Sequence, residues 1–196
     1  MVFSATSLRL AIVFLTIFLA SSVLAATDDG RLTLGYTVVL LDFSYPVSRP
    51  FWQDLTTELG DLDIGQSLRA QILWMRREQF HKCIDCRQII QVSVQGNCMS
   101  ADGNAEPGSG PLGWVYVVGD QIQPFAFVNC NRLRYLLRTA MRDRARREQQ
   151  NKMARALARI IKHELTHILT QDSRHSVSGL QKAYLTQADL LREAFP

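Results

Sequence analysis

The chain has 196 residues and a formal net charge of +4 at neutral pH, from 22 lysines and arginines against 18 aspartates and glutamates. Hydrophobic residues make up 47% of the sequence, which is enough for a globular core and excludes a disordered chain. So mild a positive charge predicts no nucleic-acid partner. The basic cluster at 142–147 is interpreted as a solvated helix face, with an anionic surface such as lipid headgroups as the alternative.

Residues 1–25 have the pattern of a secretory signal peptide. Arg9 supplies the positive charge, residues 10–19 are apolar, and small residues precede Ala25, after which we expect cleavage. The alternative is an uncleaved membrane anchor, because the apolar run is close to the shortest length that spans a bilayer. Cleavage leaves residues 26–196 as one domain without a stable membrane span, secreted to the periplasm or the extracellular space.

Alternation of apolar and polar residues predicts strands, and longer periodic segments predict helices. The expected strands cover residues 31–43, 88–94, 114–118 and 124–128. The expected helices cover residues 51–59, 64–80, 131–162 with a division near 147–151, and 185–195. Ser48 and Thr186 are expected to cap the helices that follow them.

The four cysteines are Cys83, Cys86, Cys98 and Cys130. An even number in an exported chain predicts two disulfides, and the spacing leaves all three pairings open. The alternative is that Cys83 and Cys86, with His81 nearby, form a redox-active or metal-binding pair. We favour structural disulfides because the other two cysteines lack a matching spacing.

Residues 163–167 read His-Glu-Leu-Thr-His. On a helix, positions i and i+4 lie on one face, so His163 and His167 can direct both imidazoles at one metal ion. Glu164 is offset from both and would reach the water that a catalytic zinc activates. The motif has a false-positive rate, and the alternative is an amphipathic helix with two incidental histidines.

The helix that contains this motif is predicted to be amphipathic. The expected apolar stripe consists of Met153, Leu157, Ile161, Leu165 and Ile168, and the expected solvent-facing side consists of Arg155, Arg159, Lys162 and Thr166. The histidines fall at the border of the stripe, where side chains can be anchored and still face a cavity. We expect the helix to end near residue 171.

His175 follows the motif and is the preferred third metal ligand. The chain would turn back after the helix, with Gly179 permitting a further turn. Asp189 and Glu193 are the alternative third ligands, and we rank them below His175. Tyr184 could donate a hydrogen bond to a developing oxyanion, or could instead be a core tyrosine with one polar contact.

These residues resemble the active-site region of zincin metallopeptidases, which carry the His-Glu-x-x-His motif. The third histidine makes the chain most similar to the metzincin-like branch, and the pairs His175-Ser176 and Gly179-Leu180 resemble small secreted bacterial zincins. The resemblance covers only about the last forty residues. It also departs from the usual metzincin pattern, because Gln181 occupies the position of the methionine turn.

The resemblance implies an α+β, zincin-like fold with a small mixed sheet beside a long active-site helix. It implies a Zn²⁺ ion held by His163, His167 and His175, and hydrolysis of peptide or protein substrates with Glu164 as general base. It further implies that an edge strand binds the extended substrate. The alternative function is a catalytically inactive secreted zinc-binding or interaction domain.

Overall fold

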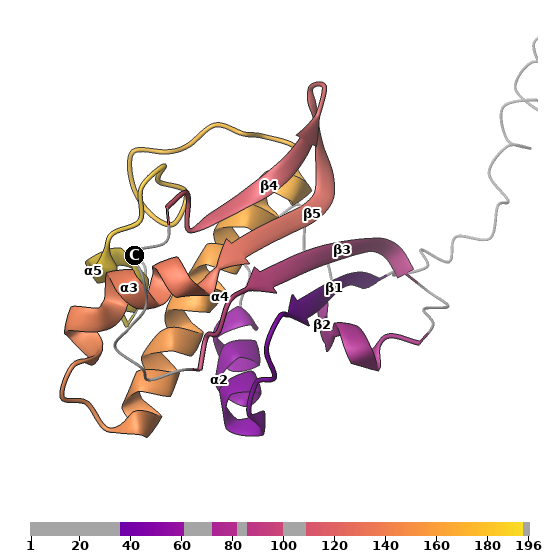
Figure 1. Cartoon of the computed structure of the whole chain (residues 1–196). Coiled ribbons are helices and arrows are strands. Elements are labelled where there is room, and N and C mark those ends of the chain that lie inside the picture. The colour runs from indigo at the N-terminus through magenta and orange to yellow at the C-terminus, as the bar shows by residue number, and fades with distance from the viewer. Residues whose placement is uncertain (1–35, 61–71, 82–85, 100–108, 194–196) are drawn as a thin grey trace, which may run out of the picture. The chain divides into compact units, whose positions relative to one another are not determined.

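The computed structural model describes residues 36–60, 72–81, 86–99 and 109–193 (Figure 1). The expected signal peptide lies outside the described residues, so it and the domain bounds stay predictions. The elements follow in this order: β1 (Tyr36–Phe43), α2 (Arg49–Leu59), β2 (Ile72–Arg76), the 3-10 helix η1 (Arg77–Gln79), β3 (Cys86–Gln95), β4 (Gly113–Val118), β5 (Gln121–Asn129), α3 (Cys130–Met141), α4 (Arg146–Thr170) and α5 (Gln187–Leu191).

The five described strands form one mixed sheet in the order β2-β1-β3-β5-β4. β1 runs parallel to β2 and β3, and β3 runs parallel to β5, whereas β4 is antiparallel to β5. The combination of this sheet with several helices confirms the predicted α+β class. The expected strands at 88–94, 114–118 and 124–128 are confirmed as β3, β4 and β5, and the described part of the first expected strand is β1.

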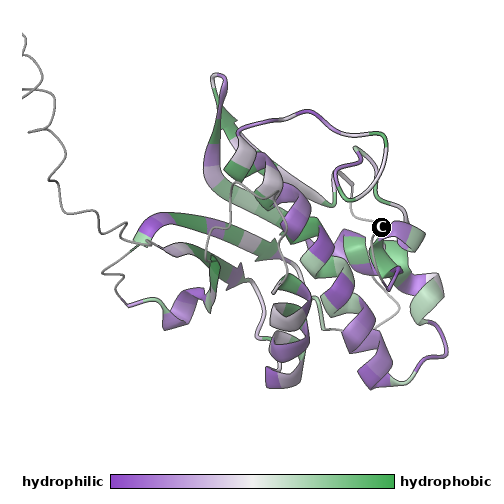
Figure 2. Cartoon of the chain, turned by 180° about the vertical axis from the view of Figure 1, so that it is seen from behind, coloured by the Kyte–Doolittle hydropathy of each residue, from purple (hydrophilic) through white to green (hydrophobic). Residues whose placement is uncertain are grey.

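One face of the sheet packs against helices and forms the core. α2, α3 and α4 lie on the same side of the sheet, as the opposite views in Figures 1 and 2 show. Because side chains alternate across a strand, every second residue points towards these helices. The buried set on β3 and β5 is Ile90, Val92, Val94, Ala126 and Val128. Each aliphatic side chain of this size contributes about 1.5–3 kcal/mol when buried, which fixes α4 against the sheet.

α4 is the central helix of the core and is 25 residues long. Its predicted apolar stripe is confirmed: Met153, Leu157, Ile161, Leu165 and Ile168 are all buried. Apolar and hydrophilic residues alternate along this helix in Figure 2. The helix therefore has one side anchored in the core, and its C-terminal turns place Glu164 against Gly113 of β4 and Gln171 against Ile122 of β5.

The helix predicted over 64–80 is wrong in its described part, because residues 72–76 form strand β2 and residues 77–79 form η1. Ile72 and Met75 pair with Thr37 and Leu40 of β1 in parallel register. A short apolar run such as Ile-Leu-Trp-Met suits a helix or a buried strand equally, so periodicity alone does not decide it. Here the parallel pairing with β1 makes the segment a strand.

The division between α3 and α4 was expected near 147–151 and instead lies at residues 142–145. Asp143 adopts a left-handed conformation with φ of 62°, which ends the first helix. The polar run at 147–151 continues α4, since Glu148 forms an i,i+4 ion pair with Lys152 and also contacts Arg144. That run is therefore part of the helix rather than a linker.

Both predicted caps are confirmed. The Ser48 side chain accepts a hydrogen bond from the backbone N–H of Phe51 at the start of α2. Thr186 and Asp189 form a reciprocal capping box at the start of α5. α5 ends at Leu191, so the terminal helix is shorter than the predicted range 185–195.

A disulfide joins Cys98 to Cys130, and Cys86 is disulfide-bonded as well. The first bond ties the segment after β3 to the first residue of α3. Disulfides are compatible with the predicted extracellular location. Among the described residues, no helix is long and apolar enough to cross a membrane.

Candidate metal centre

His163 and His167 lie on the last two turns of α4 and are only 7% and 5% exposed. Their Nε2 atoms are 3.2 Å apart. Two ring nitrogens at this distance repel each other if both carry only a lone pair, and a positive charge between them would remove that repulsion. A shared proton or a metal ion would meet this requirement.

The other ring nitrogens decide how the two imidazoles are oriented. His163 Nδ1 donates to the backbone oxygen of Leu180 at 2.8 Å, and His167 Nδ1 donates to the backbone oxygen of Asp172 at 2.6 Å. A carbonyl oxygen can only accept, so each Nδ1 carries the proton and each Nε2 presents its lone pair. Metal-binding histidines are oriented by the same kind of outer hydrogen bond.

His175 completes the group from the segment that follows α4. Its ring centroid lies 5.3 Å from that of His163 and 4.9 Å from that of His167. The potential ligand atoms of the three histidines all lie within 4.8 Å of one another. The three side chains are therefore close enough to bind one metal ion.

The distance between His163 and His167 fits a tetrahedral ion. Metal–nitrogen bonds of about 2.0–2.1 Å at tetrahedral angles place two nitrogens about 3.3–3.4 Å apart, close to the 3.2 Å between His163 and His167. Burial lowers the pKa of His163 and of His175, which favours the neutral imidazole that a metal requires. Three imidazoles suit zinc and several other first-row divalent metals.

The end of α4 determines how the chain returns to the histidines. Gln171 is left-handed, with φ of 53°, and ends the helix where the sequence predicted. Its side chain bonds the backbone N–H and carbonyl oxygen of Ile122 in β5, at 3.2 Å and 2.9 Å. The turn at Gly179, with φ of 72°, then brings Leu180 to His163.

The two carboxylates considered as alternative ligands lie elsewhere. Asp189 is bonded to Lys182 at 2.7 Å and to the backbone and hydroxyl of Thr186, and these bonds hold its pKa well below the usual range. Its carboxylate therefore already has partners. In the described part of the chain, the candidate metal group contains neither Asp189 nor Glu193.

Glu164 is 5% exposed and lines the same pocket as the three histidines. Burial raises its pKa to about 8 when no metal is present. A divalent cation held beside it would favour the carboxylate and lower this pKa again. A metal ion held by the three histidines would therefore influence the protonation of this carboxyl group.

Gly113, the first residue of β4, is a site residue that sequence reasoning missed. The backbone of β4 passes so close to Glu164 that a larger residue at 113 would overlap the carboxylate. A glycine at the start of a predicted strand can mark such a close approach, and that was the available signal.

The pocket above the histidines has a volume of about 760 Å³. Its walls come from residues 110–115, from α3, from α4 and from the segment after α4. Tyr184 lies on this wall and is 86% exposed, so the prediction of a core tyrosine is wrong. A volume of this size lies within the range of ligand-binding pockets.

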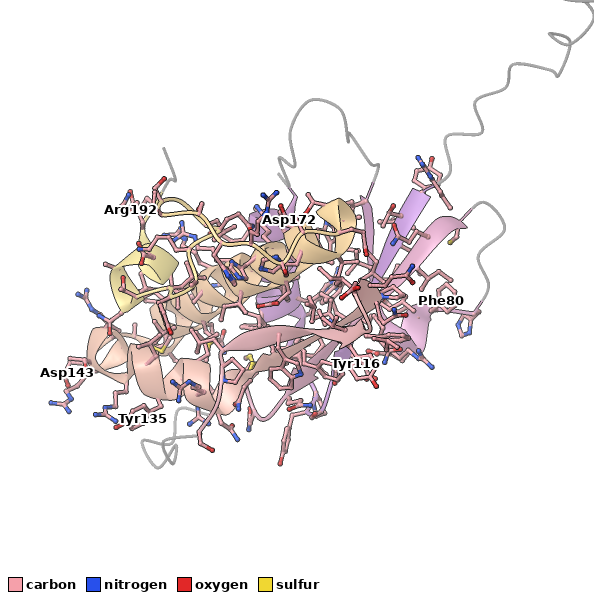
Figure 3. The ribbon with its side chains drawn as sticks, turned by 90° about the horizontal axis from the view of Figure 1, so that it is seen from above. Phe80, Tyr116, Tyr135, Asp143, Asp172 and Arg192 are labelled. Carbon is pink, nitrogen blue, oxygen red and sulfur yellow. A yellow bond between two sulfur atoms is a disulfide. The ribbon has the colours of Figure 1, made fainter. Side chains whose placement is uncertain are left out.

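Arg159 was expected to face solvent, and this is wrong because it is only 6% exposed. Its guanidinium donates to the backbone oxygens of Asp189, at 2.7 Å, and of Arg192. Arg192 is labelled in Figure 3, beside α5. Helical periodicity could not predict this contact, because it depends on where the C-terminal segment packs. The hydrogen bonds of Arg159 attach the C-terminal segment, which also contains Leu180, to α4.

No family model matches the chain, and no curated protein or solved structure is significantly similar to it.

Proposed function

We propose that the protein is an exported zinc-dependent metallopeptidase of the zincin type. The observation that carries this proposal is the convergence of three imidazoles beside a buried Glu164 in one pocket. The signal-like N-terminus and the disulfides support export.

Zinc is the proposed metal because three protein nitrogens with room for a further ligand are typical of catalytic zinc. His163, His167 and His175 would hold it. His175 is exposed whereas the other two histidines are buried, so the site opens towards the pocket at that side. When bound, zinc supplies a Lewis acid that acidifies water and polarises a carbonyl oxygen.

Glu164 is proposed as the general base. Its carboxylate would take a proton from the attacking water, whose oxygen forms the new bond to the carbonyl carbon of the peptide. Glu164 would then pass that proton to the amine nitrogen as the carbon–nitrogen bond breaks. Gly113 leaves the carboxylate the space in which to do so.

The substrate backbone is proposed to lie along β4. This strand is at the edge of the sheet, next to β5 alone, and its first residues line the pocket. An edge strand can pair with an extended peptide through its backbone groups. Tyr184, which is exposed and also lines the pocket, would donate a hydrogen bond to the developing oxyanion.

The test is hydrolysis of a broad peptide library by the zinc-loaded protein, beside a Glu164→Gln variant. We expect the variant to keep one zinc per chain while cleavage falls by a factor of about 10²–10⁴. A Glu148→Gln variant, changed at a half-buried position on the first turn of the same helix, is the matched control and should cleave normally.

Two outcomes would contradict the proposal. Cleavage that survives in the Glu164→Gln variant would mean that another group, or a contaminant, does the chemistry. Stoichiometric zinc without any cleavage by the unmodified protein would favour the alternative of a catalytically inactive zinc-binding domain.

A further inference from the structure

The turn that follows α4 is attached to the sheet by the side chain of Gln171. Its amide oxygen accepts a hydrogen bond from the backbone N–H of Ile122 in β5 at 3.2 Å, and its amide nitrogen donates to the backbone oxygen of the same residue at 2.9 Å. The amide nitrogen also donates to the backbone oxygen of Ile168, near the end of α4, at 2.8 Å. The side chain therefore joins the end of the helix to the start of β5.

Ile122 can form these bonds because it lies beyond the part of β5 that pairs with β3. The register between the two strands covers Phe125 to Asn129 of β5. On its other side, Ile122 pairs with Val117 of β4. Backbone groups of a strand need hydrogen-bond partners. The amide of Gln171 thus bonds both backbone groups of Ile122 at a point that the described register of β3 does not reach.

Gln171 adopts a backbone conformation that is unfavourable for its residue type. Its φ is 53°, in the left-handed region, where glycine is the usual residue at the end of a helix. A residue with a Cβ atom is less stable there than glycine. Glycine at this position would form the turn more easily, but it would lack the amide that bonds Ile122. The side-chain contacts, rather than the turn conformation, therefore account for a glutamine at 171.

The next four residues connect this attachment to two of the three histidines. The backbone oxygen of Asp172 accepts the Nδ1 proton of His167 at 2.6 Å. The carboxylate of Asp172, which is labelled in Figure 3, accepts from the backbone N–H of Arg174 at 2.9 Å and from its guanidinium at 2.7 and 3.0 Å. His175 follows directly. A displacement of Gln171 would therefore disturb both the outer hydrogen bond of His167 and the position of His175.

We propose that Gln171 is a positioning residue of the metal centre, because its side chain fixes the turn that orients His167 and delivers His175. None of its own hydrogen bonds involves a histidine, so it acts only through this turn. Loss of a hydrogen-bond partner of a metal-binding histidine weakens metal binding by about 10–100-fold, and we expect the lower end of this range because Gln171 lies one contact further out. The inference rests on the metal centre of the function proposed above and requires no peptidase activity.

The experiment compares metal binding by three variants with that of the unmodified protein. Gln171→Met keeps the length of the side chain and removes its hydrogen bonds, whereas Gln171→Gly favours the left-handed turn and removes the side chain. The matched control is Gln149→Met, because the amide nitrogen of Gln149, in the first turns of α4, donates to the backbone oxygens of Met141 and Arg144 at 3.1 Å and 2.9 Å. Competition with a chromogenic chelator measures Zn²⁺ affinity, and the visible absorption of bound Co²⁺ reports the geometry of the site.

We expect both Gln171 variants to bind Zn²⁺ about tenfold more weakly than the unmodified protein and to change the position and intensity of the Co²⁺ absorption bands. Gln149→Met should bind both metals normally, although it loses a similar pair of hydrogen bonds. Gln171 is exposed, and glycine relieves the left-handed strain, so Gln171→Gly should unfold at about the same urea concentration as the unmodified protein. A weaker metal site in a protein of unchanged stability is the result that identifies a positioning residue.

Unchanged Zn²⁺ affinity and Co²⁺ absorption in either Gln171 variant would overturn the inference, because the turn would then position the histidines without the amide. Equal losses in Gln171→Met and Gln149→Met would also overturn it, since a general loosening of α4 would explain both. If the unmodified protein bound no metal, the inference would fail together with the metal centre. Failure of the peptidase proposal alone has a different signature: the unmodified protein would bind metal and cleave nothing, while the variants still differ in metal affinity as expected.

Discussion

A Cβ atom at Gly113 would lie 2.6 Å from Oε1 of Glu164 and 2.7 Å from Cγ2 of Ile160. Real Cβ atoms essentially never come this close to other heavy atoms, so any side chain at 113 must displace either β4 or the carboxyl group. The position of the proposed general base is thus linked to a glycine that is about fifty positions earlier in the chain.

The first prediction concerns Gly113→Ala. The new methyl group should move Glu164 and lower the rate of peptide hydrolysis by about 10- to 100-fold, because small displacements of a catalytic group are costly. Overpacking should also lower the free energy of unfolding by about 1–3 kcal/mol. Zinc content should stay at one per chain, since the three heavy atoms nearest to the added atom belong to Glu164 and Ile160 and not to a histidine.

The control for Gly113→Ala is Gly119→Ala in the turn between β4 and β5. Gly119 has φ of 59°, so alanine is strained there, but no heavy atom lies within 4 Å of the added Cβ. It should destabilise the protein and leave hydrolysis by the folded fraction unchanged. If both variants lose hydrolysis in parallel, Gly113 acts only through stability.

The second prediction concerns the pH dependence of stability in metal-free protein. Burial raises the pKa of Glu164 from 4.5 to about 8, so between these values the folded chain holds a proton that the unfolded chain releases. The free energy of unfolding should therefore fall as pH rises from about 5 to about 8. Glu164→Gln removes this loss, so it should gain stability relative to the unmodified protein, by up to about 5 kcal/mol at pH 8.

Urea unfolding with a chelator at pH 5 and pH 8 measures this difference. The comparison between variant and unmodified protein isolates Glu164, because both proteins keep the same histidines. A stability difference that does not change with pH would show that Glu164 is not held in its neutral form. With zinc bound, the pH-dependent gain should shrink, because the nearby cation favours the carboxylate.

The contrast between α4 and its surroundings shows what sequence can predict. The helix and its two histidines depend on spacing within one element, so periodicity and motif predicted both. β2 depends on pairing with β1, which lies far away in the chain, and its short apolar run does not reveal that pairing. Local pattern predicted local structure and failed where a distant strand decided the outcome.

The residues of the candidate site fall into the same two groups: those that local pattern predicts and those that depend on contacts with distant segments. His175 could be proposed from its ligand chemistry, but its distance from the other histidines depends on the turn after Gln171. Gly113 and Arg159 act through contacts with segments remote in sequence, so no spacing rule reveals them.

The third prediction concerns Arg159→Met. The variant loses two charge-assisted hydrogen bonds to the backbone of the C-terminal segment, at Asp189 and Arg192. We expect the free energy of unfolding to fall by about 2–4 kcal/mol. Zinc affinity should also fall, because the segment that carries Leu180 is no longer fastened to α4.

Arg155→Met provides the comparison for Arg159→Met. Arg155 lies on the same helix and forms a partly exposed ion pair with Glu58 at 2.8 Å. Such pairs contribute only about 0–1 kcal/mol, so this variant should unfold almost normally and keep its zinc affinity. Equal losses in the two variants would contradict the role assigned to Arg159.

The fourth prediction concerns the bond between Cys98 and Cys130, which are separated by 32 residues. Replacing both with alanine should lower the free energy of unfolding by about 3–4 kcal/mol, since the unfolded chain regains the freedom of that loop. Chemical denaturation of the purified variant measures the change. An unchanged stability would mean that the bond contributes nothing to the fold.

The most direct test of the account is the zinc content of the purified protein, measured beside that of a His175→Ala variant. The account predicts one zinc per chain in the unmodified protein and at least a tenfold weaker affinity in the variant, which keeps only His163 and His167 as ligands. Undiminished zinc affinity in the variant would contradict the three-histidine site. The absence of zinc from both proteins after metal loading would contradict the metallopeptidase proposal as a whole.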